Sequence, residues 1–549
     1  MFKEFYTQRL KRGLVRRLNN LKIQRAAKLV ARHSLPADGA PIVFFKASTG
    51  IDDLSWNSGF HLLTSWALRL QGIPVAYFAC NSGMSKCVLG TNRDDPHKGM
   101  PCSSCVMQSK ALYAGVRSDG FGRHRAKATE VATTSAAHWF DFGRDIELES
   151  AIRDLDISRL SRFTYHDIPL GALCLPGLRW ILRIHHLNDD EDTRYLLREY
   201  ILSAWNVARK FSDFLDQTQP RAVVVFNGQF FPEATARWVA QKRGLRVITH
   251  EVGLEPATAY FTEGEATAYP IHIPDEFELS ETQNVKLDAY LARRFQGDFT
   301  MAGVKFWADM KGLDESFLKK AAGFKQIVPV FTNVIFDTSQ PHSNTVFEDM
   351  FDWLDMTLEV IREHPETLFV IRAHPDETRV RKSSRETVEG WATRYEVRKE
   401  PNVVFIGPGE SLSSYELIQK SKFVMVYNST IGLEASIMGM PVLCAGRARF
   451  TQYPTVFFPQ TADDVRRKMK EFLAAEKIEV PAEFKRNARR FLYYQLYRTS
   501  LPLGDFLEPS VRVTQAKLKP FDLNDLLKSN SIKAILEGLL EGGDFLLKE

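Results

Sequence analysis

Two short segments in the C-terminal half of the 549-residue chain combine residue types that bind phosphate. Ala373-His374-Pro375-Asp376 and Asn428-Ser429-Thr430-Ile431-Gly432-Leu433-Glu434 each follow an apolar run that is typical of a buried strand. Ser429 and Thr430 stand where a helix is expected to begin, so two hydroxyls, free backbone N–H groups and the positive helix end would converge on an anion. His374 would add a donor or a positive charge to the same anion.

Each of these residues also has a plainer interpretation. Ser429 or Thr430 alone is equally consistent with a simple N-cap, and a His-Pro pair after a strand is commonly a turn. Both segments, however, are expected at strand ends of one parallel sheet, and ligands bind at the carboxyl ends of such strands. The combination therefore favours a binding site.

Four cysteines in the N-terminal half form a second group with potential chemistry. Cys80, Cys87, Cys102 and Cys105 have the spacing Cys-x6-Cys-x14-Cys-x2-Cys. A Cys-x2-Cys pair presents two thiolates from one turn, and a second pair would complete the tetrahedral geometry of a structural zinc site. The wide spacing of the first pair leaves three interpretations open: a structural zinc site, free or buried thiols, and an iron–sulfur or redox site.

The elements that must position the C-terminal segments alternate regularly between strands and helices. Strands are expected near residues 326–331, 368–372, 403–406, 423–427 and 441–444. Helices are expected near residues 347–363, 384–398, 413–419, 432–438 and 462–475. Strands separated by helices of this length predict a parallel sheet with right-handed crossovers.

The N-terminal half shows the same alternation around a less regular centre. Strands are expected near residues 41–46, 73–78, 222–226 and 246–249, and helices near residues 56–70, 200–214 and 232–242. The region from Cys80 to about Tyr195 carries the cysteines and several helical stretches in an insertion without a clear pattern. These elements predict a first doubly wound domain.

The chain is therefore expected to be an α/β protein with two Rossmann-like doubly wound domains. The predicted division is a basic amphipathic helix at residues 1–36, an N-terminal domain at 37–274, a linker at 275–323, a C-terminal domain at 324–480 and a helical tail at 481–549. The linker assignment rests on the polar and weakly patterned character of its sequence.

The overall composition excludes several classes of protein. With 44% hydrophobic and 25% charged residues and a formal net charge of +5, the chain is an ordinary globular protein, and nothing indicates a nucleic-acid partner. No stretch approaches the roughly 18 apolar residues of a membrane span, and the basic N-terminus lacks the apolar block of a signal peptide. We therefore expect a cytoplasmic protein.

The basic residues are concentrated at the N-terminus. Glu4 is almost the only acidic residue among Lys3, Arg9, Lys11, Arg12, Arg16, Arg17, Lys22, Arg25, Lys28 and Arg32. Leu10, Leu14, Leu18 and Leu21 recur between them at helical spacing. This pattern predicts a helix that binds the anionic inner face of the cytoplasmic membrane, and a simple solvated face is the alternative.

The C-terminal half resembles the capsule polysaccharide biosynthesis glycosyltransferases of bacteria, which have the GT-B architecture. The resemblance rests on residues 331–337, 371–375, 413–415, 428–434 and 439–442, and it extends only loosely into the N-terminal half. It implies two Rossmann-like domains with a cleft between them and the transfer of a sugar from a nucleotide-sugar donor to a polysaccharide or glycolipid acceptor. No cofactor is expected for this chemistry.

The same resemblance implies roles for residues of the C-terminal domain. His374, Ser429 and Thr430 match the His-Pro and Ser-Ser/Thr motifs that bind the donor phosphate in capsular Kdo transferases and bacterial sialyltransferases. Glu434 matches the acidic residue that often holds the nucleotide ribose in GT-B enzymes. Asn333 and Arg372, which lie within the matching segments, complete the predicted donor site.

The N-terminal domain is then expected to supply the acceptor site and a general base. Glu251, with His250 beside it, follows a predicted strand and is the candidate base, although a loop cap or salt bridge is the plainer interpretation. The predicted acceptor site comprises Ser48, Thr49, Gly50, Asn227 and Gly228, which lie directly after predicted strands.

Two other functions share the expected architecture. A nucleotide-sugar 2-epimerase also places a His-Pro and a serine-rich helix start around a diphosphate, but its acidic, glycine-rich phosphate loop is absent from residues 428–434. A non-catalytic, membrane-associated subunit of a polysaccharide assembly complex would explain the basic N-terminus and leave the intact site residues without a purpose.

Overall fold

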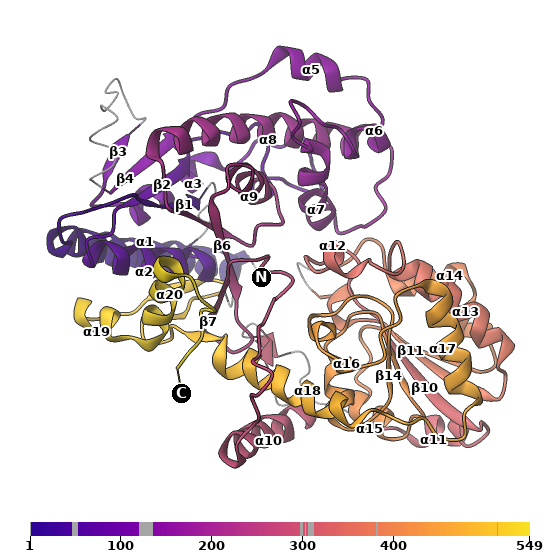
Figure 1. The fold of residues 1–549 in the computed structure, drawn as a ribbon. Coiled ribbons are helices and arrows are strands. Elements are labelled where there is room, and N and C mark those ends of the chain that lie inside the picture. The colour runs from indigo at the N-terminus through magenta and orange to yellow at the C-terminus, as the bar shows by residue number, and fades with distance from the viewer. Residues whose placement is uncertain are drawn as a thin grey trace.

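The computed structural model describes residues 2–46, 53–119, 135–296, 300–301, 304–305, 312–379, 383–512 and 514–548. The chain forms two α/β domains, each built on a central sheet, and the two domains face each other across a gap (Figure 1). This arrangement confirms the expected fold class of two Rossmann-like domains in a GT-B architecture.

The N-terminal domain contains an eight-stranded sheet. In spatial order its strands are β15 (Leu501–Pro502), β7 (Thr258–Thr262), β6 (Arg246–Val252), β5 (Ala222–Phe226), β1 (Ile42–Lys46), β2 (Val75–Cys80), β4 (Ala136–Phe140) and β3 (Arg117–Asp119). The strands from β6 to β3 are parallel, whereas β7 and β15 pair antiparallel at one edge.

Helices cover both faces of this sheet, as the apolar sequence of β1 requires. Ile42 and Phe44 pack on one face, and Val43 and Phe45 pack on the other, because successive side chains of a strand point to opposite sides. The first face is covered by α1 (Phe2–His33), α2 (Trp56–Leu70), α3 (Cys102–Leu112), α19 (Leu523–Lys528) and α20 (Asn530–Glu541). The second face is covered by α5 (Ile146–Ile152), α6 (Ile157–Ser161), α7 (Leu170–Leu182), α8 (Glu191–Thr218) and α9 (Glu233–Lys242).

The C-terminal domain contains a fully parallel five-stranded sheet. Its strands, in spatial order, are β12 (Val403–Ile406), β11 (Thr367–Arg372), β10 (Gln326–Phe331), β13 (Val424–Val426) and β14 (Val442–Cys444). The chain winds from β10 outward to β12 and then returns to β13 on the opposite side. The switch point of the sheet therefore lies between β10 and β13, where doubly wound sheets bind ligands.

Two helical layers cover this second sheet. One layer consists of α13 (Met350–Glu363), α14 (Val388–Arg394) and α17 (Ala462–Ala474). The other consists of α10 (Glu281–Phe295), α11 (Glu315–Ala321), α15 (Ser414–Gln419), α16 (Ile431–Ile437) and α18 (Ala482–Tyr493). The short elements α12 (Gln340–Ser343), β8 (Thr300–Met301), β9 (Val304–Lys305), β16 (Leu507–Pro509) and β17 (Ala516–Leu518) complete the fold.

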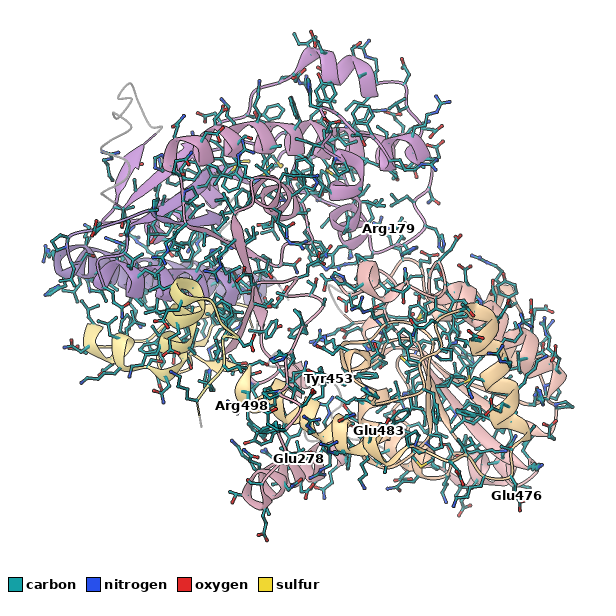
Figure 2. The ribbon with its side chains drawn as sticks, viewed as in Figure 1. Arg179, Glu278, Tyr453, Glu476, Glu483 and Arg498 are labelled. Carbon is teal, nitrogen blue, oxygen red and sulfur yellow. The ribbon has the colours of Figure 1, made fainter. Side chains whose placement is uncertain are left out.

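The structure corrects the assignment of residues 275–323 as a plain linker. Helix α10 lies within this segment, begins with a complete capping box of Ser280 and Gln283, and buries Leu287 and Leu291 in the core of the C-terminal domain. Glu278, just before the helix, pairs with Arg486 of α18 (Figure 2). Within residues 281–295, the polar residues that suggested a linker belong to a packed helix.

The tail is also more than a helical extension. After α18, the π-helical turn Tyr494–Arg498 returns the chain to the N-terminal domain, where β15 pairs with β7. Helix α20 then buries Ile532, Ile535 and Leu539 in the same core as α2. The N-terminal domain is thus closed by the last segment of the chain.

Helix α1 belongs to the same core. Ile23, Ala27 and Val30 are buried against α2 and α3, and Asn19 donates a hydrogen bond of 2.9 Å to Asp53. Within the described residues, no helix combines the length and the apolar character that a membrane crossing requires.

Candidate functional site

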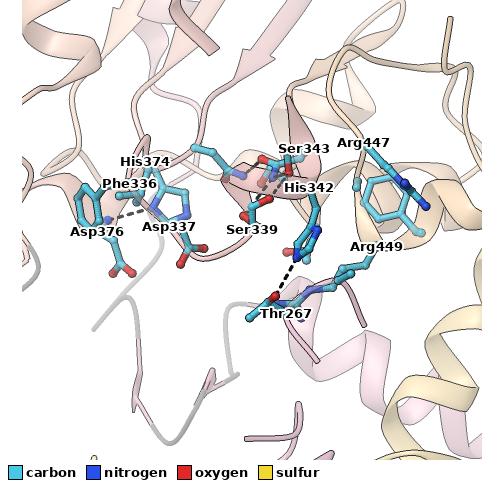
Figure 3. A pocket seen from close by; sticks show the side chains of 18 of the residues that line it. Thr267, Phe336, Asp337, Ser339, His342, Ser343, His374, Asp376, Arg447 and Arg449 are labelled. Carbon is cyan, nitrogen blue, oxygen red and sulfur yellow. Dashed lines mark hydrogen bonds between the residues drawn. The ribbon is translucent and has the colours of Figure 1, made fainter. Parts of the chain in front are cut away.

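A cavity of about 290 Å³ lies between the domains, at the carboxyl ends of the C-terminal strands (Figure 3). The C-terminal domain contributes most of its wall: Asn333, Val334, Phe336, Asp337, Ser339, His342, Ser343, His374, Asp376, Asn428, Ser429, Thr430, Arg447, Ala448, Arg449, Phe450 and Gln452. The N-terminal domain and the segment that follows it contribute Trp180, Arg183, Thr267, Ala268 and Pro270. The cavity therefore occupies the position where a doubly wound sheet binds its ligand.

Two asparagines tie together the strand ends at the switch point. Asn333 follows β10 and Asn428 follows β13, and the Asn333 side-chain amide donates to the side-chain oxygen Oδ1 of Asn428. The Asn428 amide in turn donates to Ser343 Oγ at 2.5 Å and to Ser339 Oγ at 3.2 Å. These bonds hold the loop before α16 in place, so that Ser429 and Thr430 face the cavity.

Thr430 is the N-cap residue of α16, but it does not act as a side-chain cap. Within the described structure, its hydroxyl makes no capping hydrogen bond to the backbone of the helix. The backbone N–H groups of Gly432 and Leu433 donate to the carbonyl oxygens of Ser429 and Thr430, and both of these hydroxyl residues line the cavity. The plain N-cap interpretation is therefore not supported for Thr430, which lies in the wall of the cavity.

His374 is oriented by the turn that follows it. Its Nδ1 accepts a hydrogen bond of 3.1 Å from the backbone N–H of Asp376 (Figure 3). A neutral imidazole that accepts at Nδ1 carries its proton on Nε2. His374 is thus arranged to donate a hydrogen bond from Nε2.

Three arginines at the cavity were not identified from the sequence. Arg447 and Arg449 follow β14, and Arg183 follows α7 of the N-terminal domain. The Arg449 guanidinium lies 3.7 Å from the centre of the Tyr269 ring, and burial lowers the pKa of Arg183 to about 10. The rule that strand ends carry ligand contacts would have found Arg447 and Arg449 if it had been applied to the last strand.

Glu251 is the second-last residue of β6, and it is not among the residues that line this cavity. Asn227 donates a hydrogen bond of 2.5 Å to Glu251 Oε1, and the backbone N–H of Val252 donates to Oε2 at 3.1 Å. Burial raises the pKa of Glu251 to about 7. The positive charge of Arg449 opposes this rise, and the negative charge of Asp337 adds to it. Glu251 is therefore within electrostatic reach of two residues that line the cavity.

Asn227 holds Glu251 by a hydrogen bond, and neither Asn227 nor Gly228 lines the described cavity. Both have positive φ angles, of 61° and 81° respectively, which the tight turn after β5 requires. A Cβ atom at Gly228 would meet Arg237 Cδ at 2.9 Å. The predicted acceptor residues Ser48, Thr49 and Gly50 lie outside the described residues.

His250 differs from its predicted role beside the base. Its side chain is fully buried, its ring centre lies 4.4 Å from that of His61 and 5.0 Å from that of Phe261, and neither ring nitrogen has a hydrogen-bond partner among the described residues. Residues 250 and 251 both belong to β6, which is longer than expected, so their side chains point to opposite faces. His250 therefore packs in the core and does not orient Glu251.

Two predicted donor residues are also structural. Glu434 is buried, its Oε1 accepts from Arg294 Nε at 2.6 Å, and its Oε2 accepts from the Tyr415 hydroxyl. Arg372 is buried and donates to the backbone carbonyl of Leu412. In this structure neither side chain belongs to the described cavity wall.

His342 connects the two domains at one side of the cavity. Its Nε2 lies 2.9 Å from Thr267 Oγ1, 3.0 Å from Gln229 Nε2 and 3.1 Å from Glu265 Oε2 (Figure 3). Arg237 pairs with the same glutamate at 2.5 Å. The sequence carried no signal for this network, because its members come from four separate segments.

The four cysteines lie together around one small, mostly apolar pocket. Burial raises the pKa of Cys87 to about 12 and raises that of Cys80 further, so both are thiols in this arrangement. Across the residues that the structure describes, they do not form a group of three sulfur atoms within 4.8 Å of one another. A zinc site at Cys80, Cys87, Cys102 and Cys105 stays a prediction, and it would require the sulfur atoms to approach.

The fold and the cavity define a two-domain α/β protein of GT-B architecture with hydroxyl, imidazole and guanidinium groups at the strand ends of its C-terminal sheet. Residues 308–478 match the family model described as capsule polysaccharide biosynthesis protein. The resemblance to that family is thus confirmed for the C-terminal domain.

Similar proteins were found by sequence and by structure. The chain is 24% identical over 307 residues to protein FixF of Sinorhizobium fredii, a match that covers 55% of this chain and 65% of that relative. The Thermosulfurimonas dismutans KpsC β-Kdo 2,4-transferase is 11% identical, with a TM-score of 0.34 over 56% of this chain and 86% of that one. The UDP-GlcNAc 2-epimerase of Neisseria meningitidis, solved with UDP-GlcNAc, is 15% identical, with a TM-score of 0.25 over 54% of this chain and 81% of that one.

Proposed function

We propose that the protein is a glycosyltransferase that moves a sugar from a nucleotide-sugar donor to a surface-polysaccharide or lipid-linked acceptor. The observation that carries the proposal is the cavity at the ends of the C-terminal strands, where the Ser429 and Thr430 hydroxyls, the His374 imidazole and the Arg447 guanidinium lie in one wall. The match of residues 308–478 to the capsule polysaccharide family supports it.

The donor phosphate is proposed to lie against the C-terminal wall. Thr430 and Ser429 would donate from their hydroxyls, His374 from Nε2, and Arg447 would supply positive charge. Such preorganised donors stabilise the negative charge that develops on the leaving nucleotide phosphate. In this scheme Asn333 acts through Asn428 by fixing the loop that carries the hydroxyls.

Glu251 is proposed to be the general base. A carboxyl group with a pKa near the operating pH can take the proton of an acceptor hydroxyl and release it after the transfer. Asn227 donates a hydrogen bond to one oxygen of the Glu251 carboxylate and so fixes the orientation of that carboxylate. Direct inversion at the sugar carbon would then require no cofactor.

A panel of nucleotide sugars without an acceptor distinguishes this function from its two alternatives. A transferase slowly hydrolyses one member of the panel, a 2-epimerase changes the sugar and leaves the nucleotide bond intact, and a non-catalytic subunit does neither. Melting temperatures with CMP, UDP and GDP identify the nucleotide, since a ligand at 100 times its Kd stabilises the fold by about 2.7 kcal/mol.

We further propose that the enzyme works at the inner face of the cytoplasmic membrane, held there by α1. Leu14, Leu18 and Leu21 are 60%, 51% and 42% exposed, and they lie on the face of the helix opposite the buried Ile23 and Val30. The exposed basic residues beside them are Lys11, Arg17, Lys22 and Arg25. Leucines between basic residues suit an anionic bilayer surface, where each Lys or Arg contributes about 1 kcal/mol.

The membrane proposal is tested by substitution, because deletion of α1 would also remove part of the core. We expect the triple variant Leu14→Ser, Leu18→Ser and Leu21→Ser to lose flotation with anionic liposomes at low salt. The control, Leu35→Ser with Val285→Ser, changes two exposed apolar residues elsewhere and should float like the parent protein. Equal flotation of all three proteins would contradict the proposal.

A further inference from the structure

A cluster of histidines and carboxylates crosses the gap between the domains at a second place, outside the donor cavity. His185 and His186 follow α7 of the N-terminal domain, while Asp349 caps α13 and Glu386 precedes α14 in the C-terminal domain. His186 Nε2 lies 2.8 Å from Asp349 Oδ2, and His186 Nδ1 lies 2.6 Å from Glu386 Oε1.

Three side chains of this cluster have the arrangement of metal ligands. Over the described part of the chain, His185, His186 and Asp349 are the group whose possible ligand atoms all lie within 4.8 Å of one another. Two imidazoles and one carboxylate form a donor set that zinc and similar transition metals prefer, with a fourth position left for water.

A second observation at His185 points to a ligand. This side chain is 7% exposed, and its Nδ1 has no hydrogen-bond partner among the described residues. Buried polar atoms are usually paired, so an orphaned nitrogen beside a carboxylate marks an unfilled interaction. A metal ion held by His186 and Asp349 would supply the missing partner.

The surroundings complete the requirements of a metal site. Glu386 contacts His186 Nδ1, so it would orient the ring as the carboxylate neighbours of metal-bound histidines do. A cavity of about 550 Å³, lined in part by His186 and Glu386, gives solvent access to the cluster. Arg179 is the nearby cation on the N-terminal side of the gap (Figure 2), and the carboxylates of Asp349 and Glu386 balance its charge.

We propose that His185, His186 and Asp349 bind a divalent transition metal ion of the zinc type, with Glu386 as the carboxylate that orients His186. The ion replaces the proton that His186 and Asp349 share, and that proton passes to solvent. Because the ligands come from both domains, the bound ion joins the two domains beside the donor cavity. The proposal concerns the assembly of the domains and does not depend on the reaction at the cavity.

The experiment uses the full chain freed of metal with a chelator and then titrated with Co²⁺ and with Zn²⁺. We expect a tetrahedral Co²⁺ visible spectrum without a cobalt–thiolate band, which separates this site from the four cysteines. His185→Ala should weaken Zn²⁺ binding at least 100-fold, and Glu386→Gln should weaken it by roughly 10- to 100-fold. His97→Ala changes an exposed histidine that pairs with Asp192 and should bind like the parent protein.

The outcome is decided by the spectrum and the affinities together. Absence of metal binding, a spectrum dominated by thiolate bands, or equal affinity in the parent and in Glu386→Gln would overturn the proposal and leave the cluster as an ion-pair contact between domains. The Glu386 variant keeps the test valid if His185→Ala fails to fold, since Glu386 lies near the surface.

Discussion

The two sheets carry similar polar residues after their strands but use them differently. In the C-terminal sheet, Asn333, His374, Asn428 and Arg447 follow four different strands and all line one cavity. In the N-terminal sheet, Asn227 after β5 donates a hydrogen bond to Glu251 near the end of β6. The charges of Arg449 and Asp337, which line the cavity, act on Glu251.

The difference has a structural cause. The C-terminal strands end before their polar residues, so short loops can present several donors to one point. Strand β6 instead continues through Val252 and pairs with β7, which fixes alternate side chains on opposite faces. The C-terminal strand ends therefore bring several polar side chains to one cavity, whereas Glu251 interacts with that cavity only through the charges of Arg449 and Asp337.

The largest effect is expected from Glu251, whose pKa responds to the charges of Arg449 and Asp337 in the cavity wall. Glu251→Gln keeps the hydrogen bond from Asn227 possible and removes the basic oxygen, so turnover should fall by roughly 10²- to 10⁴-fold with little change in nucleotide affinity. In the parent protein the base is ionised above its pKa of about 7, so kcat/KM should rise with pH through that value.

A control variant accompanies this measurement. Glu255→Gln, a half-buried neighbour on the same segment, serves as the control and should retain most of its turnover. A Glu251→Gln enzyme with nearly full activity would mean that the N-terminal sheet supplies no base, and the comparison between the two sheets would have to be revised.

A second test separates structure from binding within one helix, α16. Glu434→Gln leaves the Arg294 guanidinium buried without its ionic partner, and the free energy of unfolding should fall by about 3–5 kcal/mol. Glu359→Gln removes the partner of Arg466 at the surface and should cost at most about 1 kcal/mol.

Urea unfolding and nucleotide affinity are measured on both variants. If Glu434→Gln weakens nucleotide binding and leaves stability nearly unchanged, Glu434 belongs to the donor site, as the resemblance to GT-B enzymes implies. That result would require Arg294 to release the carboxylate when the nucleotide binds.

The sequence predicted the elements well and the site in part, for reasons visible in particular residues. The helix Trp56–Leu70 and the strands Ala222–Phe226 and Gln326–Phe331 have the expected bounds because their apolar patterns are strong and local. His374 and Thr430 reached the cavity because strand ends converge in any parallel sheet.

The misplaced residues depend on partners that are distant in the sequence. The Glu434 carboxylate is bound to Arg294, which lies 140 residues away in the sequence, and no local sequence pattern predicts that pair. His250 lies outside the candidate site because β6 ends three residues later than its apolar run suggested. The cluster of His185, His186 and Asp349 forms only when the two domains come together.

The third prediction concerns the anion site itself. Thr430→Val and His374→Ala each remove one donor from the proposed phosphate position, so turnover should fall by roughly 10²- to 10³-fold and nucleotide affinity should weaken. Both residues line a cavity, so the melting temperature should change little. Thr378→Val, on the same loop as His374, is the control. Unchanged affinity and rate in both test variants would remove the donor site from the C-terminal sheet.

The smallest expected effect concerns the buried His250 of the N-terminal sheet and the pH dependence of the free energy of unfolding. Burial holds the pKa of His250 and of His61 well below the usual range, and the charge of Lys46 adds to the shift. A histidine whose pKa is lower in the folded state stabilises the fold above the unfolded pKa of about 6.5, and that stability is lost as the pH falls below it. Each such histidine contributes a slope of at most about 1.4 kcal/mol per pH unit.

We therefore expect His250→Leu to unfold with a shallower dependence on pH between 6.5 and 5 than the parent protein, whereas His272→Leu, which changes an exposed histidine, should keep the parent slope. Denaturant unfolding at several pH values measures all three slopes. A His250→Leu slope equal to that of the parent would show that His250 takes up a proton in the folded state, and it would return this residue to the candidates for a role beside Glu251.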